Sequence, residues 1–73
     1  MDIIAHILAI AKEGERKTHI MYGANLSYTL LKKYLALLLE TNLLQTRKNK
    51  GKVIYTTTEK GIELLQKMKN ATN

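Results

Sequence analysis

The residues best suited to chemistry lie in the stretch TRKNKGK, residues 46–52, where four of seven side chains are cationic and none is acidic. Residues 16–52 carry eight basic residues against Glu40 alone, a net charge of +7, while the whole chain has a net charge of +6. Cationic side chains gathered in one half of a chain attract polyanions, because neutralised phosphates release their condensed counterions. This region therefore indicates binding to an anionic partner.

A second group of polar and cationic side chains follows a predicted helix at about residues 27–41, for which Ser27 is a good N-cap. The spacing of apolar residues predicts a core-facing stripe formed by Leu31, Tyr34, Leu35 and Leu38. The opposite face carries Thr29, Lys32, Lys33 and Ala36, with Tyr28 at its N-terminal edge. We expect this second face to contact the partner, whereas Tyr34 and Tyr55 fall on apolar stripes and are expected in the core.

The elements that must position these groups are predicted from periodicity and turn signals. A helix over residues 2–14 ends at Gly14, and a short helix begins near Lys17 or Thr18 and ends at Gly23 and Asn25. The period then changes to two, which predicts antiparallel strands at 43–48 and 52–57 joined by Asn49, Lys50 and a left-handed Gly51. A last helix is capped by Thr58, and Gly61 near its start predicts tight packing, since glycine costs a helix about 1 kcal/mol relative to alanine.

Catalytic and metal chemistry are not expected. The chain has no Cys, no Ser with a plausible His and acid set, no phosphate-binding glycine loop and no apolar pair of carboxylates, and Glu13 and Glu15 lie in a loop-like, exposed stretch. His6 lies away from the main stripe of the first helix, four residues after Asp2, and His19 has no second ligand at metal spacing. Both are expected on the surface rather than at a metal. We therefore predict a protein that is not an enzyme, with no catalytic residue, no metal and no cofactor.

The length of 73 residues predicts a single domain, 1–73, with too small a core for a wide stability margin. Without disulfides or a metal, a homodimer is the expected source of support. The first and last helices carry more apolar residues than one core stripe needs, so one row of each is expected in the core and the other in an interface. The rows on the first helix are Ile3, Ile7 and Ile10, and Ile4, Leu8 and Ala11; on the last helix Leu64 and Met68 stand beside Ile62 and Leu65. No signal peptide or membrane span is visible, which predicts a cytoplasmic protein.

The order of these elements, three helices, a hairpin and a helix, places the hairpin as a wing after a helix-turn-helix. The motifs LSYTLLKKYLALLLETNLL and YTTTEKG, within a similarity covering about residues 3–68, resemble the small archaeal winged helix-turn-helix transcriptional regulators related to the MarR-type group. This resemblance implies an α+β, mainly α fold and sequence-preferring binding of double-stranded DNA, commonly as a homodimer. The wing is shorter than in the broader group, and no added domain for an effector is visible, so no small-molecule effector is predicted.

The expected DNA-binding residues come from three elements. The N-terminal part of the recognition helix would enter the major groove, the hairpin tip at 46–52 would contact the backbone or minor groove, and the start of the second helix would reach the flanking backbone. The predicted residues are Arg16, Lys17, Ser27, Tyr28, Thr29, Lys32, Lys33, Arg47, Lys48, Lys50 and Lys52. Lys32 and Lys33 could contact bases or phosphates, and Tyr28 could contact DNA or pack on Leu26.

Other readings stay open at this point. The basic hairpin tip could be a solvated loop whose charges prevent edge-to-edge pairing. The chain could be a winged-helix protein-interaction module within a larger assembly, with its basic residues facing an acidic partner. Single-stranded or RNA binding is less favoured, because Phe and Trp are absent and only four Tyr are present for stacking. A short protein without an activation segment would most simply act as a repressor, by occluding its site.

Overall fold

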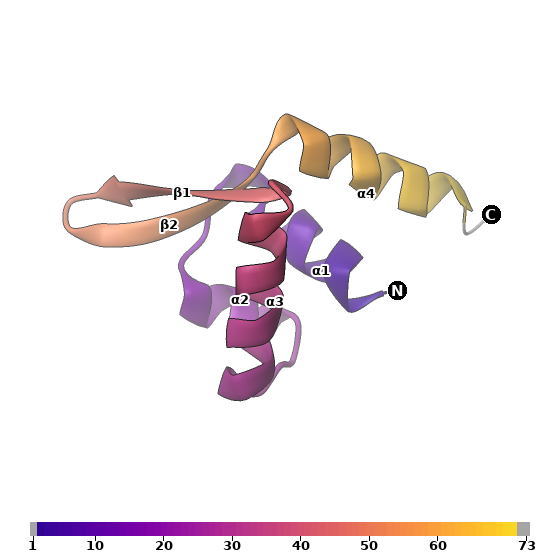
Figure 1. Ribbon diagram of the computed structural model, residues 1–73. Coiled ribbons are helices and arrows are strands. Elements are labelled where there is room, and N and C mark those ends of the chain that lie inside the picture. The colour runs from indigo at the N-terminus through magenta and orange to yellow at the C-terminus, as the bar shows by residue number, and fades with distance from the viewer. Residues whose placement is uncertain (1, 72–73) are drawn as a thin grey trace.

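A computed structural model describes residues 2–71 of the chain. Its elements are, in order, α1 (Ile3–Ile10), the short 3-10 helix η1 (Ala11–Glu13), α2 (Lys17–Gly23), α3 (Tyr28–Glu40), β1 (Leu44–Asn49), β2 (Lys52–Thr57) and α4 (Glu59–Ala71). The hairpin projects from one side of the molecule, and α1 and α4 lie toward the other (Figure 1). The predicted fold class, α+β and mainly α with a two-stranded antiparallel hairpin, is confirmed.

The helix boundaries follow the predicted capping residues. Ser27 has extended backbone angles, and its Oγ accepts a hydrogen bond from the Leu30 N–H at 3.2 Å, which satisfies one of the free donors at the start of α3. Thr58 does the same for α4, where its Oγ1 accepts from the Gly61 N–H at 3.0 Å. The connection between α2 and α3 turns at Asn25, whose φ is 55°, a left-handed conformation that asparagine tolerates.

The hairpin turn is tighter than the sequence predicted. The strands pair from Leu44 opposite Thr57 to Asn49 opposite Lys52, so Asn49 belongs to β1 rather than to the turn. The turn consists of Lys50 and Gly51, with φ values of 53° and 79°. Two positive φ angles match a type I′ turn, whose twist suits the two strands. Lys50 thus shares the left-handed conformation that was expected of Gly51 alone.

The core lies where α1, α2, α3, the base of the hairpin and α4 meet. Its fully buried large side chains are Ile7, Leu8, Ile20, Leu31, Leu38 and Leu44. On α3 the predicted core stripe is confirmed, with Tyr34 only half-buried. The predicted division of the α1 rows is wrong: Ile7 from one row and Leu8 and Ala11 from the other are all buried, because α1 packs against several elements at once.

Two contacts join the base of the hairpin to the helices. Thr57 is buried, and its Oγ1 donates to the Leu8 carbonyl oxygen at 2.7 Å, which ties β2 to α1. Gly61 packs so closely that a Cβ there would overlap the Leu43 carbonyl oxygen and Thr57 Cγ2. The tight packing predicted for Gly61 is therefore confirmed, and it is what places α4 across the base of the hairpin.

A third segment extends the hairpin. Glu15 forms an isolated bridge with Tyr55, through backbone hydrogen bonds of 2.9 and 2.8 Å. Glu15 is half-buried, so the prediction that it lies in an exposed loop is wrong, although Glu13 is exposed. Because α2 starts two residues later, the bridge brings the start of α2 beside β2. Within residues 2–71, every helix is too short or too polar to cross a bilayer.

Candidate nucleic-acid interface

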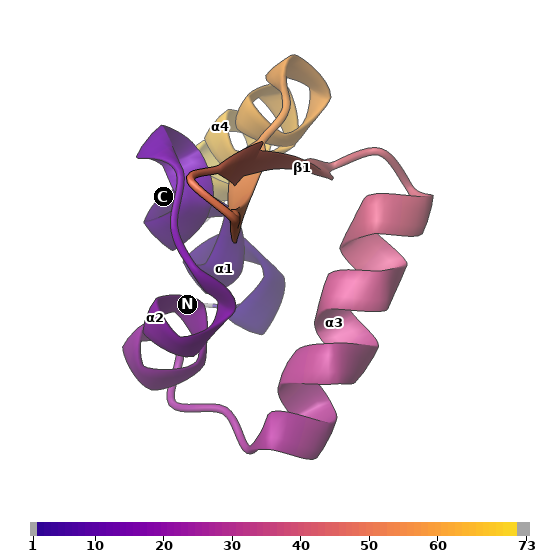
Figure 2. The same ribbon diagram turned by 90° about the vertical axis from the view of Figure 1, so that its left-hand side faces the viewer.

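The predicted DNA-binding residues lie on the start of α2, on α3 and on the hairpin. Every one of them is exposed. Figure 2 views the molecule from the side on which the hairpin projects, with α2 and α3 to either side below it. The three elements therefore border one face of the molecule, and contacts among their side chains show how closely they join.

The exposed face of α3 is opposite its core stripe. Thr29, Lys32, Lys33 and Ala36 are all exposed, whereas Leu31, Leu35 and Leu38 are buried. This division follows from the helical repeat of 3.6 residues, which separates the two sets onto opposite sides. The side chains predicted to face DNA are thus accessible to solvent and are not covered by other parts of the protein.

Tyr28 joins α2 to α3. Its ring lies 5.7 Å from Lys17 Nζ and 5.5 Å from Lys32 Nζ, which are cation–π distances. The side chain is 53% exposed, so it lies at the surface with the lysines rather than buried against Leu26. One aromatic ring therefore holds two ammonium groups, one from each helix, near the N-terminus of α3.

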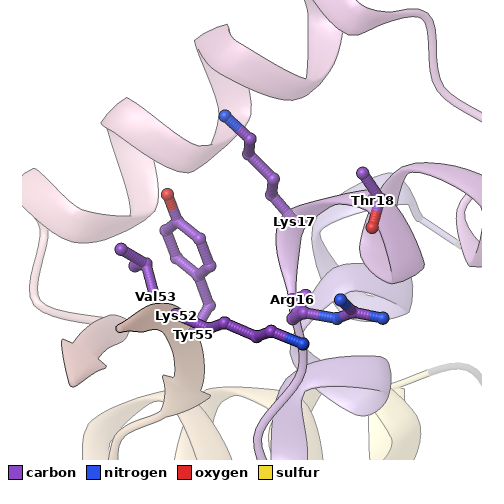
Figure 3. A pocket seen from close by; sticks show the side chains of 6 residues that line it. All are labelled: Arg16, Lys17, Thr18, Lys52, Val53 and Tyr55. Atoms are coloured by element: carbon purple, nitrogen blue, oxygen red, sulfur yellow. The ribbon is translucent and has the colours of Figure 1, made fainter. Parts of the chain in front are cut away.

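An open cleft of about 340 Å³ joins α2 to the hairpin (Figure 3). In Figure 3 Lys17 and the Tyr55 ring both point toward α3. The lining carries three cations and no acid, and it consists of Arg16, Lys17, Thr18, Lys52, Val53 and Tyr55. Lys17 thus contributes both to this cleft and to the Tyr28 ring, so shared contacts link Lys32 to Lys17 and Lys17 to Lys52.

The hairpin divides its basic residues between its two faces. Successive side chains of a strand point to opposite faces. Lys48 is opposite Val53, which lines the cleft, whereas Arg47 is opposite Ile54. The Arg47 guanidinium lies against Gly14, where a Cβ would sit 3.3 Å from its Nη2 atom. The structure therefore places Lys48 on the Val53 face of the hairpin and Arg47 on the Ile54 face, beside Gly14, while Lys50 occupies the turn.

These cations are not neutralised internally. Within residues 2–71 none of the predicted Arg and Lys residues forms an ion pair, and the ion pair that is seen joins His19 Nδ1 to Glu15 Oε1 at 3.1 Å. His6 and His19 are exposed, as predicted. The described part of the chain contains no cluster of His, Cys, Asp or Glu that could hold a metal ion. The face can therefore attract anions through its uncompensated positive charge.

The sequence did not identify three lining residues of the cleft. Thr18 and Val53 carried no signal. Tyr55 was expected in the core; it is half-buried and packs against the core, and it also lines the cleft. The Glu15–Tyr55 bridge creates this cleft, and a one-residue bridge has no periodicity that a sequence could reveal.

A helix-turn-helix followed by an antiparallel hairpin that borders its recognition helix defines a winged helix protein. The chain belongs to the winged helix-turn-helix family, whose model matches residues 1–73. Two relatives are uncharacterised proteins of the archaeon Methanocaldococcus jannaschii. MJ0287 is 35% identical, with 88% of this chain and 73% of that protein covered. MJ0290 is 42% identical over 90% of this chain, which spans only 30% of that protein's length.

Solved structures show the same fold. Sso10a-2, a DNA-binding protein from the archaeon Sulfolobus solfataricus, superimposes with a TM-score of 0.86 at 28% identity, covering 96% of this chain and 74% of that one. BpsR of Bordetella bronchiseptica, whose DNA binding is regulated by 6-hydroxynicotinic acid, has a TM-score of 0.81 at 16% identity, covering 93% of this chain and 52% of that one. The second likeness shows the fold alone.

Proposed function

We propose that this protein is a sequence-preferring regulator of transcription that binds double-stranded DNA, with residues 1–73 acting as one winged helix domain. The recognition helix, about 27–41, would lie in the major groove, and the wing, 46–52, would contact the backbone or minor groove. The observation that carries the proposal is the linked set of cations, in which Lys32 and Lys17 share the Tyr28 ring and Lys17 and Lys52 share the cleft. The DNA-binding protein Sso10a-2, with the same fold, supports it.

The roles within this surface follow from position. Ser27, Tyr28 and Thr29 begin the recognition helix, where hydroxyl groups can donate to phosphate oxygens. Lys32 and Lys33 lie one turn further along, within reach of base edges or phosphates. Arg16, Lys17 and Lys52, which share the cleft, would hold the backbone between the helix-turn-helix and the wing. Such contacts fix the register of the protein on DNA without reading the sequence.

A repressor that occludes its site is the simplest mode of action for such a domain, and a MarR-like grouping would agree with it. Neither an effector nor a catalytic step is part of this proposal. The alternative, a winged helix module that binds an acidic protein, would use the same cations. DNA binding itself separates the two functions.

The test is a titration of duplex DNA at several salt concentrations. We expect log K to fall linearly with log salt, because each neutralised phosphate contributes a slope of about −0.9. Lys32→Ala and Lys50→Ala should each reduce the magnitude of the slope by about one.

Lys67→Ala is the matched control for this titration, since Lys67 is exposed on α4, away from the cationic face, and its loss changes net charge equally. We expect Lys67→Ala to leave the slope unchanged. Absence of binding at low salt would overturn the DNA proposal and favour the protein-interaction module.

We also propose that the protein is a homodimer through α1 and α4. Support comes from the half-buried residues Ile3, Ile4, Leu64 and Met68, and from the position of both helices away from the wing (Figure 1). A two-fold axis there would place two recognition helices roughly one DNA turn, about 34 Å, apart and favour a palindromic site.

Sedimentation at micromolar concentration should show a dimer. Met68→Lys should shift it toward monomer, and Lys67→Ala should not. A monomeric unmodified protein would contradict this proposal.

A further inference from the structure

The exposed surface of α3 is unusual in the chemistry that it offers. Of its exposed residues, Thr29, Leu30, Ala36, Leu37 and Leu39 end in methyl groups, and Leu30 and Leu37 are the most exposed leucines, at 43% and 45%. The sequence YTLLKKYLALLLE contains no Asn, Gln or Arg. The helix that faces DNA in the proposed function therefore lacks every amide and guanidinium group and is rich in methyl groups.

The spacing places four of these side chains in two rows, which lie about 100° apart around the helix. Thr29 and Ala36 are seven residues apart, so they lie on the same face two turns apart, and Leu30 and Leu37 form the next row. Lys33 lies between Thr29 and Ala36 along the helix and borders the leucine row. The two methyl-bearing rows thus flank Lys33, and both lie outside the stripe of buried Leu31, Leu35 and Leu38.

The major groove offers a matching group. Adenine is read in both of its major-groove positions by Asn or Gln, and guanine by Arg or Lys, whereas thymine presents a C5-methyl group that apolar side chains contact. On α3 the lysines can reach guanine or phosphate, but no side chain can make the bidentate amide contact to adenine. An A·T pair can then be recognised in this groove chiefly through its thymine methyl.

We infer that Thr29, Ala36 and Leu37, with Leu30 at the edge, recognise thymine through its C5-methyl group, so that the preferred sites contain thymines at fixed positions opposite α3. This inference rests on the proposed function and adds the chemical basis of its sequence preference. Thr29 is the leading residue, because the N-terminal part of a recognition helix lies closest to the base edges.

The experiment removes only the methyl groups. Duplexes bound by the protein are selected from a random pool, and the tightest is resynthesised with single thymines replaced by deoxyuridine, which pairs identically and keeps the charge. We expect one or more replacements to weaken binding about fourfold, the loss for one buried methyl group. The salt dependence should not change.

The matched protein variant is Thr29→Ser, which removes the side-chain methyl and keeps the hydroxyl. At the position that Thr29 contacts, the ratio of the dissociation constants for the uracil and thymine duplexes should fall to nearly one in this variant. Leu37→Ala should lower the same ratio at a second position. Both residues are exposed, so the free energy of unfolding measured in urea should be nearly unchanged in both variants. Comparing the unmodified and variant proteins on both the thymine and the uracil duplex separates the loss of a methyl contact from any effect of uracil on DNA shape.

Two results would overturn the inference. Equal binding of thymine and uracil duplexes at every position, with salt-dependent binding intact, would reject methyl recognition and leave the proposed function standing. A thymine preference that Thr29→Ser and Leu37→Ala leave unchanged would show that other residues, or DNA shape, provide it. Absence of DNA binding altogether would instead reject both the inference and the proposed function.

Discussion

The two ends of this small molecule are built on different principles. At the end formed by α1, α4 and the base of the hairpin, the decisive contacts are close: Ile7 and Leu8 have no exposed surface, and Gly61 has no room for a Cβ. At the end formed by the start of α2, the N-terminal part of α3 and the wing, the Arg and Lys side chains are exposed, and none of them forms an ion pair within the described residues. The first end should therefore govern stability and the second binding, with little overlap between them.

The sharpest test of this separation compares two residues on opposite faces of α3. Leu38→Ala should cost about 2–5 kcal/mol of unfolding free energy, because Leu38 is fully buried and the substitution leaves a cavity. Lys33→Ala should change stability by less than about 0.5 kcal/mol, since Lys33 is exposed, yet it should weaken DNA binding. Urea unfolding and DNA titration of both variants measure the two effects. A large loss of stability in Lys33→Ala would break the comparison.

Two glycines provide the next comparison. Gly61→Ala should destabilise the protein by about 1–3 kcal/mol, because the new Cβ overlaps Leu43 and Thr57, and this overpacking outweighs the better helix propensity of alanine. Gly51→Ala at the wing tip meets no atom within 4 Å, so its cost should be only the left-handed strain of about 1 kcal/mol. Thermal unfolding of both variants orders the two costs. The reverse order would mean that α4 can shift away from Leu43 easily.

The smallest effects concern two adjacent threonines of β2. Thr57→Val removes the buried hydrogen bond to the Leu8 carbonyl and should cost about 1 kcal/mol. Thr56→Val should be neutral or slightly stabilising, because Thr56 Oγ1 is buried and has no hydrogen-bond partner among the described residues. The urea midpoints of the two isosteric variants measure how much stability each substitution removes. Equal midpoints would show that the link between β2 and α1 contributes nothing.

Much of the local structure could be predicted because it depends on nearby residues. The caps at Ser27 and Thr58 and the core stripe of α3 each involve residues three or four apart, whose types reveal the interaction. The close packing at Gly61 was predictable for a related reason, since a glycine inside a helix is unfavourable unless something excludes a side chain. The turn was less predictable, because an Asn before Lys-Gly is equally compatible with a two- or three-residue loop.

The candidate site could be predicted only as a list of residues. Their charge and exposure followed from the sequence, but their grouping did not. No local pattern indicates that Lys17 and Lys32 meet at Tyr28, or that Arg47 and Lys48 diverge. The apolar rows of α1 show the same limit, because a helix packed on several sides has no single buried stripe. In both cases the missing information is which elements lie beside one another.

By itself, then, the sequence determined the helices and strands, their caps and the segregation of charge, since these follow from short-range periodicity and side-chain chemistry. Only the tertiary structure decided that Glu15 pairs with Tyr55, that this pairing opens a cationic cleft, and that one continuous surface joins α2, α3 and the wing. The physical reason is that contacts between residues 40 positions apart depend on how whole elements pack, and no local pattern encodes that packing.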